Sequence, residues 1–258
     1  MAKTKYILYR ILGNDLPPRH RKGQTLANLR TILGNEPDFP GLEKHWVLNK
    51  IIDPRTERSI AAMLEKHAQP YRIIPFDRLR FNNIPKKDYQ KRLEVMIGLN
   101  QARNTALKEG KKRAQWVLVF DGNCFFTAKA WEKVAAACVR SRKQYIIVPM
   151  IRMVYPGKGI PSEPQIIFRH DSKNEFNERF GYGQDSKVEL LRRLGVAGEW
   201  DAWDGLPQQP QKANSFVTAG YVWRLPSGNE AAERDIQQRR KCRDRAIKLL
   251  MDKIDQGL

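Results

Sequence analysis

An acidic turn follows an apolar strand near the middle of the chain. Residues 116–120 are Trp-Val-Leu-Val-Phe, and Asp121, Gly122 and Asn123 come directly after them. A strand that is apolar on both faces is typical of the interior of a parallel sheet. Because open α/β sheets bind ligands at the carboxyl ends of such strands, the carboxylate of Asp121 could hold a metal-bound diphosphate. The alternative is an ordinary Asp-Gly turn.

The segment before this strand predicts an amphipathic helix. Val95, Leu99, Ala102 and Ala106 recur at helical spacing, so they would share one face. Gly110 predicts the left-handed residue that commonly ends a helix. The helix would therefore lead through a short turn into the strand that carries the acidic residues.

Together, this helix and strand resemble the core of the GT-A nucleotide-sugar glycosyltransferases, in which an Ala-Arg-Asn helix precedes a strand closed by an Asp-x-Asp-type motif. The matching residues are ARNTALKEG and WVLVFDGN. The resemblance implies that Arg103, Asn104, Gly122 and Asn123 contact the sugar nucleotide and that Asp121 and Asn123 ligate Mn²⁺ or Mg²⁺. Such an ion neutralises charge on the leaving diphosphate. Because Asn123 replaces an acid, we expect Asp121 to ligate nearly alone.

A second segment, residues 178–195, resembles the acceptor-side motif of the same superfamily, in which a Gly-Glu-Asp turn opens a helix. Gln184 replaces the usual Glu, and Asp185 keeps the acid. The resemblance implies that Asp185 is the general base that takes the proton from the acceptor hydroxyl, with inversion at the anomeric carbon. Free N–H groups at a helix start would hold this carboxylate in place. The alternative is that Asp185 is only a helix cap.

Strands are predicted at residues 6–12, 46–52 and 71–76, with helices at 26–33 and 57–67 between them. This alternation predicts right-handed βαβ units and a parallel sheet. In GT-A folds the ends of the first strands contact the nucleoside. The resemblance therefore implies donor contacts for four more residues, which are Arg10, Gly13, Asn14 and Asp53. Asp53 could equally cap the turn before Pro54.

We expect an α/β fold of the GT-A, Rossmann-like type: one domain over residues 1–258, with a mostly parallel central sheet and a small acceptor-side lobe. Residues 1–126 would bind the sugar nucleotide, and residues 127–228 would form the acceptor side. Residues 229–258 would form a C-terminal helix opened by the capping-box pattern of Ser227 and Glu230. No bilayer-spanning apolar segment and no secretory signal is visible, which predicts a cytoplasmic protein.

Aromatic residues within and after the second motif predict an acceptor site. Tyr182, Trp200 and Trp203 could stack on a sugar ring or on an unstacked base. Tryptophan is also an ordinary core residue, so packing is the alternative for both tryptophans.

The chain is strongly basic, with a formal net charge of +19 at pH 7. Residues 78–115 contain 11 basic and 3 acidic side chains, whereas residues 229–258 contain 8 and 6, so the excess belongs to the body of the protein. One sugar nucleotide does not require so much positive charge. We therefore predict nucleic-acid contacts. The residues concerned are Arg78, Arg80, Lys86, Lys87, Lys91 and Arg92. An anionic membrane would attract the same charge.

The opening residues YRILGNDLPPRH resemble the start of the base-modifying glycosyltransferases found with base-hydroxylating dioxygenases, which include base J-associated and phage enzymes. The resemblance implies transfer of glucose from UDP-glucose to a 5-hydroxymethylpyrimidine in DNA, with the base exposed or flipped, in the cytoplasm of a host or phage-infected cell. A second interpretation is a cell-envelope polysaccharide or lipopolysaccharide glycosyltransferase at the membrane surface. A third is a non-catalytic nucleic-acid-binding protein on a GT-A scaffold, since Asn123 and Gln184 replace acids.

Overall fold

The computed structural model describes residues 4–154, 158–183, 187–198 and 215–257. Within these residues one nine-stranded sheet forms the centre, with the order β3-β2-β1-β4-β7-β6-β9-β5 and with β8 paired to β6. The strands are β1 (Thr4–Leu12), β2 (Leu42–Asn49), β3 (Tyr71–Ile74), β4 (Ala114–Asp121), β5 (Cys124–Phe125), β6 (Tyr145–Val154), β7 (Lys158–Arg169), β8 (Phe216–Thr218) and β9 (Val222–Arg224). Five of the eight strand pairs are parallel, so the predicted mostly parallel sheet is confirmed.

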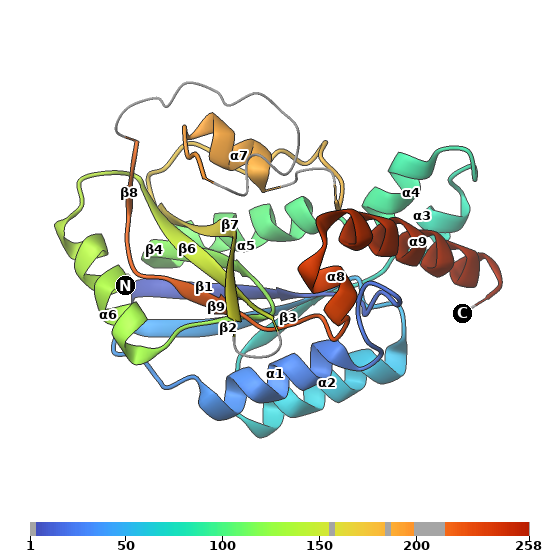
Figure 1. Cartoon of the computed structure of the whole chain (residues 1–258), viewed down its shortest axis with the longest axis horizontal. Helices are drawn as coiled ribbons and strands as arrows, with labels where there is room; N and C mark the ends of the chain where they lie inside the picture. The colour runs from blue at the N-terminus through green and yellow to red at the C-terminus, as the bar shows by residue number, and fades with distance from the viewer. Residues whose placement is uncertain (1–3, 155–157, 184–186, 199–214, 258) are drawn as a thin grey trace.

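Helices cover both faces of this sheet (Figure 1). The described helices are α1 (Gln24–Asn35), α2 (Pro54–Lys66), α3 (Arg78–Asn82), α4 (Tyr89–Met96), α5 (Leu99–Arg113), α6 (Ala128–Arg140), α7 (Val188–Arg193), α8 (Glu230–Arg234) and α9 (Ile236–Asp255). Helices α5 and α7 pack on one face, whereas α1, α2 and α6 pack on the other. The result is a three-layer α/β/α arrangement.

Alternation along β1 explains the two apolar layers, because successive side chains of a strand point to opposite faces. Ile7 and Tyr9 are buried against α5 and α7. Tyr6 and Leu8 are buried on the opposite face, together with Trp131 of α6. The central strand is therefore apolar throughout, as its place inside a parallel sheet requires.

The register of the parallel strands brings their carboxyl ends to one edge. Leu12 of β1 is paired with Leu48 of β2, and Ile11 is paired with Asp121 of β4. Gly122 then lies so close to β1 that an added Cβ would be 2.5 Å from the carbonyl oxygen of Ile11. A glycine is needed at this position because a side chain would push the two strand ends apart.

Two local predictions were wrong. Gly110 does not end α5 but lies inside it, and a Cβ at Gly110 would be 2.5 Å from Cγ1 of Val117, so the glycine lets the helix pack closely on β4. The predicted single C-terminal helix is two helices, because Asp235 caps a new helix, α9. Ser227 does not cap α8. Its N–H donates to Glu233 at 3.0 Å instead.

Helices α3, α4 and α9 gather at one end of the molecule (Figure 1). They share a small apolar cluster that includes Phe81, Leu93, Ile247 and Met251. The described helices include none with the length and apolarity needed to cross a bilayer.

Candidate functional site

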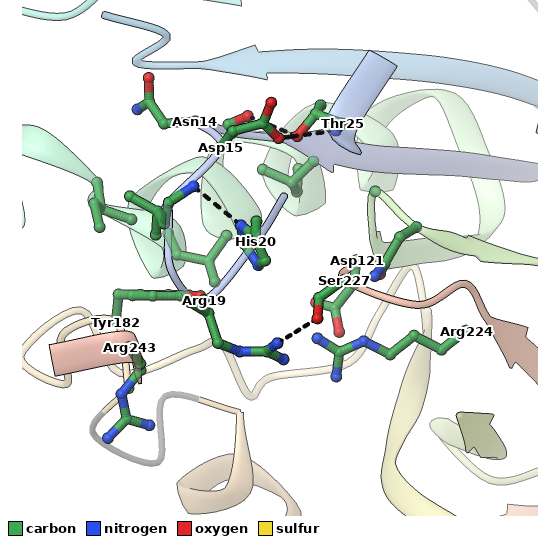
Figure 2. Close-up of a pocket in the computed structure, with 18 of the residues that line it drawn as sticks. Asn14, Asp15, Arg19, His20, Thr25, Asp121, Tyr182, Arg224, Ser227 and Arg243 are labelled. Carbon is green, nitrogen blue, oxygen red and sulfur yellow. Dashed lines mark hydrogen bonds between the residues drawn. The ribbon is translucent and has the colours of Figure 1, made fainter. Parts of the chain in front are cut away.

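A cavity of about 300 Å³ opens at the carboxyl ends of β1 and β4. The segment after β1 and the acidic turn after β4 line it, together with residues from α5, β7, β9 and α9. Figure 2 shows side chains from these separate segments, among them Asp121, Arg224 and Arg243. The edge predicted to bind a ligand is therefore the edge that contains the cavity.

Asp121 is surrounded by hydrogen-bond donors. Its Oδ1 accepts a hydrogen bond from Arg103 at 2.7 Å, and its Oδ2 accepts one from Lys187 at 3.2 Å. Gln165 of β7, which is fully buried, donates from Nε2 to Oδ2 at 3.1 Å. Both carboxylate oxygens are thus engaged by side chains of the protein itself.

Arg103 is held firmly in this position. Its Nη1 donates to Asn100 Oδ1 at 3.0 Å, and its guanidinium lies 5.2 Å from the ring centroid of Phe176. Arg103 and Asn100 are one helical turn apart on α5, a spacing at which side chains meet. The Ala-Arg-Asn helix therefore presents its arginine to the acidic turn, while the predicted contact of Arg103 with the sugar nucleotide stays a prediction.

Burial raises the pKa of Asp121, but the positive charges of Lys187, Arg103 and Arg224 outweigh this effect and hold the pKa well below its usual value. Asp121 is consequently a stable anion and a poor proton acceptor.

Basic side chains dominate the cavity. Among the described residues that line it, eight are Lys or Arg and three are Asp or Glu. The basic set is Arg19, Arg103, Arg152, Lys187, Arg224, Arg239, Arg240 and Arg243. This surplus of positive charge suits an anionic ligand with several charges.

Arg224 of β9 and Glu163 of β7 are cavity residues that the sequence did not reveal. Arg224 Nη1 lies 3.5 Å from Glu163 Oε1, and the Nε of Arg224 is buried without a hydrogen-bond partner. Burial raises the pKa of Glu163, but the nearby Lys187, Arg224 and Arg152 charges lower it to about 2. Neither residue belongs to a recognisable motif, so no sequence signal pointed to them.

His20 also lines the cavity but is uncharged. Burial, followed by the neighbouring charge of Arg19 and then of Arg224, lowers its pKa to about 3. Its Nδ1 accepts a hydrogen bond from the N–H of Leu16 at 3.3 Å, which leaves Nε2 as the protonated nitrogen. His20 can therefore donate a hydrogen bond to a ligand without adding charge.

Five of the residues predicted for the donor lie at the cavity, and these are Gly13, Asn14, Arg103, Gly122 and Asn123. The side chain of Asn14 is already used, since Nδ2 donates to Lys50 O at 2.7 Å and Oδ1 accepts from Ile52 N at 2.8 Å. Asn14 therefore joins the segments after β1 and β2.

Three other predicted donor residues have structural partners away from the cavity. Arg10 is fully buried and pairs with Glu36 at 2.5 Å. Asp53 caps α2 by accepting from the N–H groups of its first turn. Asn104 exchanges hydrogen bonds with the backbone of Phe176, at 2.8 Å and 2.9 Å. Their donor contacts stay predictions.

Of the predicted acceptor and base residues, Tyr182 lines the cavity. The adjoining Gly183 has φ 84°, and a Cβ there would be 2.4 Å from Nε of Arg243, so this segment packs closely against α9. Asp185, Trp200 and Trp203 lie outside the described residues.

The acidic turn does not form a convincing set of metal ligands. Asp121 already pairs with two cations, and Asn123, whose Nδ2 donates to Leu225 O at 3.1 Å, offers only a neutral amide oxygen. The part of the chain that the structure describes contains no group of three His, Cys, Asp or Glu side chains that could hold a metal. A divalent cation here would also be repelled by Arg103 and Lys187. The described residues therefore do not fit the metal ion that the resemblance implies.

The six residues predicted to bind nucleic acid lie on α3, on α4 and between these helices, away from the cavity. Arg80, Lys86, Lys87 and Lys91 are exposed. Arg92 is buried, where it pairs with Asp255 and lies over the ring of Phe81. Arg92 is thus a packing residue that joins α4 to α9.

Arg78 is half-buried and lies over the ring of Phe76, with 5.9 Å between the guanidinium carbon and the ring centroid. Four of the six predicted side chains therefore form an exposed basic surface, which consists of Arg80, Lys86, Lys87 and Lys91.

No family model matches this sequence, and no curated protein matches it. Solved structures do match. S. aureus TarS 1–349 in complex with UDP-GlcNAc has a TM-score of 0.51 at 14% identity, over 86% of this chain and 58% of that chain. The S. aureus TarS 1–349 structure has a TM-score of 0.49 at 14% identity, over 89% of this chain and 62% of that chain.

The mannosyltransferase PcManGT from Pyrobaculum calidifontis, in complex with GDP-Man and Mn²⁺, has a TM-score of 0.44 at 11% identity, over 84% of this chain and 57% of that chain. The chain thus spans about three fifths of the length of TarS 1–349. At these identities the likeness concerns the fold. It confirms the predicted α/β GT-A fold of the nucleotide-sugar glycosyltransferases.

Proposed function

We propose that this protein is a hexosyltransferase, and that the hexose it transfers from a UDP-sugar is glucose. The observation that carries this proposal is the basic cavity at the carboxyl ends of β1 and β4, the edge at which α/β sheets bind nucleotides. Guanidinium groups bind phosphate oxygens strongly because both partners are charged. TarS, which shares the fold, was solved with UDP-GlcNAc, and this supports a uridine diphosphate donor.

The reaction needs a base for the acceptor hydroxyl, and Asp185 is our candidate. The three described carboxylates at the cavity have other roles. Asp15 accepts from the N–H groups of Gly23 and Thr25 at 2.6 Å and 2.8 Å, Asp121 is paired with two cations, and Glu163 has a pKa of about 2. A carboxylate with a strongly lowered pKa accepts protons poorly. In the sequence, Asp185 precedes the cavity residue Lys187 by two positions.

We further propose that the acceptor is a 5-hydroxymethylpyrimidine in DNA. The exposed basic surface of Arg80, Lys86, Lys87 and Lys91 supports this, because such side chains attract the phosphates of a nucleic-acid backbone. The modified pyrimidine would reach the cavity by being exposed or flipped out of the duplex.

The test is transfer of labelled glucose from UDP-glucose onto otherwise identical duplexes that contain cytosine, 5-hydroxymethylcytosine or 5-hydroxymethyluracil, with and without Mn²⁺. Label on a hydroxymethylated duplex alone is the expected result. Label that appears only on cell-envelope polysaccharide or lipopolysaccharide would replace the DNA acceptor with an envelope acceptor. Failure to transfer or hydrolyse any member of a sugar-nucleotide panel would contradict glycosyltransferase activity and favour a binding protein.

The basic surface leads to a separate prediction for DNA binding. Changing Arg80 and Lys87 to Glu should weaken binding to duplex DNA and reduce the slope of log K against log salt by about two, since roughly one counterion is released per phosphate contact. Binding isotherms at several salt concentrations would measure the slope.

The matched control changes Lys129 and Lys133 of α6 to Glu, because both are exposed and α6 lies at the other end of the molecule (Figure 1). This control makes the same charge change but should leave DNA binding nearly unaltered. Equal losses for the two double variants would mean that DNA responds to net charge and not to this surface.

A further inference from the structure

We infer that the diphosphate of the donor is bound and neutralised by Arg103, Lys187 and Arg224, in place of a divalent metal ion. Because it concerns the donor, this idea rests on the proposed function. It assigns a different role to the acidic turn, in which Asp121 positions two cations and ligates no metal.

The first observation is that the carboxylate expected to ligate a metal is already neutralised. Arg103 and Lys187 lie 2.7 Å and 3.2 Å from the two oxygens of Asp121, and their side chains are 4% and 5% exposed. Magnesium-like ions need oxygen ligands in nearly ideal geometry. To bind here, such an ion would have to displace two buried cations from their shared anion, which leaves those charges unpaired at high cost.

The second observation is that these side chains keep hydrogen-bonding capacity at the cavity. Lys187 Nζ donates to Asp121 at 3.2 Å and to the carbonyl oxygen of Glu163 at 3.3 Å. Among the described residues these are its two acceptors, so its third N–H can donate to a ligand. Arg224 has a buried Nε with no hydrogen-bond partner, and its guanidinium points into the cavity beside Asp121 (Figure 2). A phosphate oxygen would satisfy such donors.

The third observation is the charge balance of the whole cavity, in which eight basic side chains oppose three acidic ones. During transfer the acceptor oxygen forms a bond to the anomeric carbon, and the bond from that carbon to the diphosphate oxygen breaks. The bonding electron pair stays on the diphosphate, while the acceptor proton moves to the general base. Fixed cations next to the leaving oxygen stabilise this developing charge without reorganisation.

Asp121 is then a positioning residue. It holds Arg103 and Lys187 at the cavity wall, while Gln165 fixes the carboxylate from the neighbouring strand. An anion at this position has a physical reason, because Arg103 and Lys187 would repel each other if no negative charge lay between them.

The test is calorimetric titration of UDP into the full chain after metal removal, in excess EDTA and again with Mn²⁺. We expect binding in EDTA with a Kd within threefold of the value with Mn²⁺. Binding that appears only with Mn²⁺ would overturn the metal-free site but leave a UDP-dependent enzyme intact. Absence of UDP binding under both conditions would overturn the proposed function itself.

Two variants test the cations directly. Lys187→Gln and Arg224→Gln should each weaken UDP binding by about tenfold or more, since each removes a charge-assisted hydrogen bond to the diphosphate, and Mn²⁺ should not restore it. Arg72→Gln removes an arginine that pairs with Glu109 away from the cavity, so it should leave the Kd unchanged. Unchanged UDP affinity in folded Lys187→Gln and Arg224→Gln, checked by thermal melting, would overturn the inference. If a variant does not fold, the EDTA titration of the unaltered chain decides.

Discussion

Replacement of Asp185 by asparagine is expected to lower kcat for sugar transfer by about a thousandfold, because general base catalysis contributes roughly 10²–10⁴. The amide keeps the size of the side chain but cannot take the proton from the acceptor hydroxyl. The Kd for UDP should stay within about threefold, since the donor does not need the base. Single-turnover transfer and calorimetric titration measure the two quantities.

The matched control is Glu189→Gln, which neutralises an acid four positions further along the same segment. Glu189 pairs with Arg193 on the surface of α7, and neither residue lines the cavity. This variant should keep its kcat. If Asp185→Asn retained full turnover, Asp185 would not be the general base, and the base would have to be sought elsewhere.

Replacement of Glu36 by alanine is expected to lower the free energy of unfolding by about 3–5 kcal/mol, the usual cost of breaking a buried ion pair. Glu36 Oε1 accepts hydrogen bonds from Arg10 at 2.5 Å and from the N–H of Phe126 at 2.8 Å. The Arg10 and Glu36 side chains are each 1% exposed, so the variant leaves the Arg10 charge buried without its anion. Urea denaturation followed by circular dichroism measures the change.

Asp38→Ala is the control for this second prediction. Asp38 pairs with Lys44 at 3.2 Å, but its side chain is fully exposed, and ion pairs of this kind add little stability. Its unfolding midpoint should not change measurably. A comparable loss in both variants would show that Lys44, which also lies 3.5 Å from Glu36, carries the effect.

The acidic turn and its helix illustrate how far local sequence can go. The apolar run before Asp121 predicted a buried strand, and the helix pattern around Arg103 predicted the element that packs beside it, and both are present. Hydrophobic periodicity reports burial directly, which explains this success. Gly110 misled the same reasoning, because the need for close packing against Val117 is a tertiary fact.

The residues predicted to contact the sugar nucleotide show where local sequence is not enough. Arg10, Asp53 and Asn104 have the polar character of ligand contacts, yet their hydrogen bonds go to Glu36, to the first turn of α2 and to Phe176. A polar side chain near a strand end can serve the ligand or the fold. Which one it serves depends on partners that are distant in sequence.

By itself, the sequence determined the α/β class, the parallel core and the edge of the sheet at which the site would lie, because these follow from periodicity and from strand order along the chain. Only the tertiary structure decided the electrostatics of the site. Arg103, Lys187 and Arg224 come from segments far apart in the sequence and meet Asp121 only when the strands close into one sheet. Coulomb interactions depend on distance in space, so no reading along the chain could show that this acid is surrounded by cations.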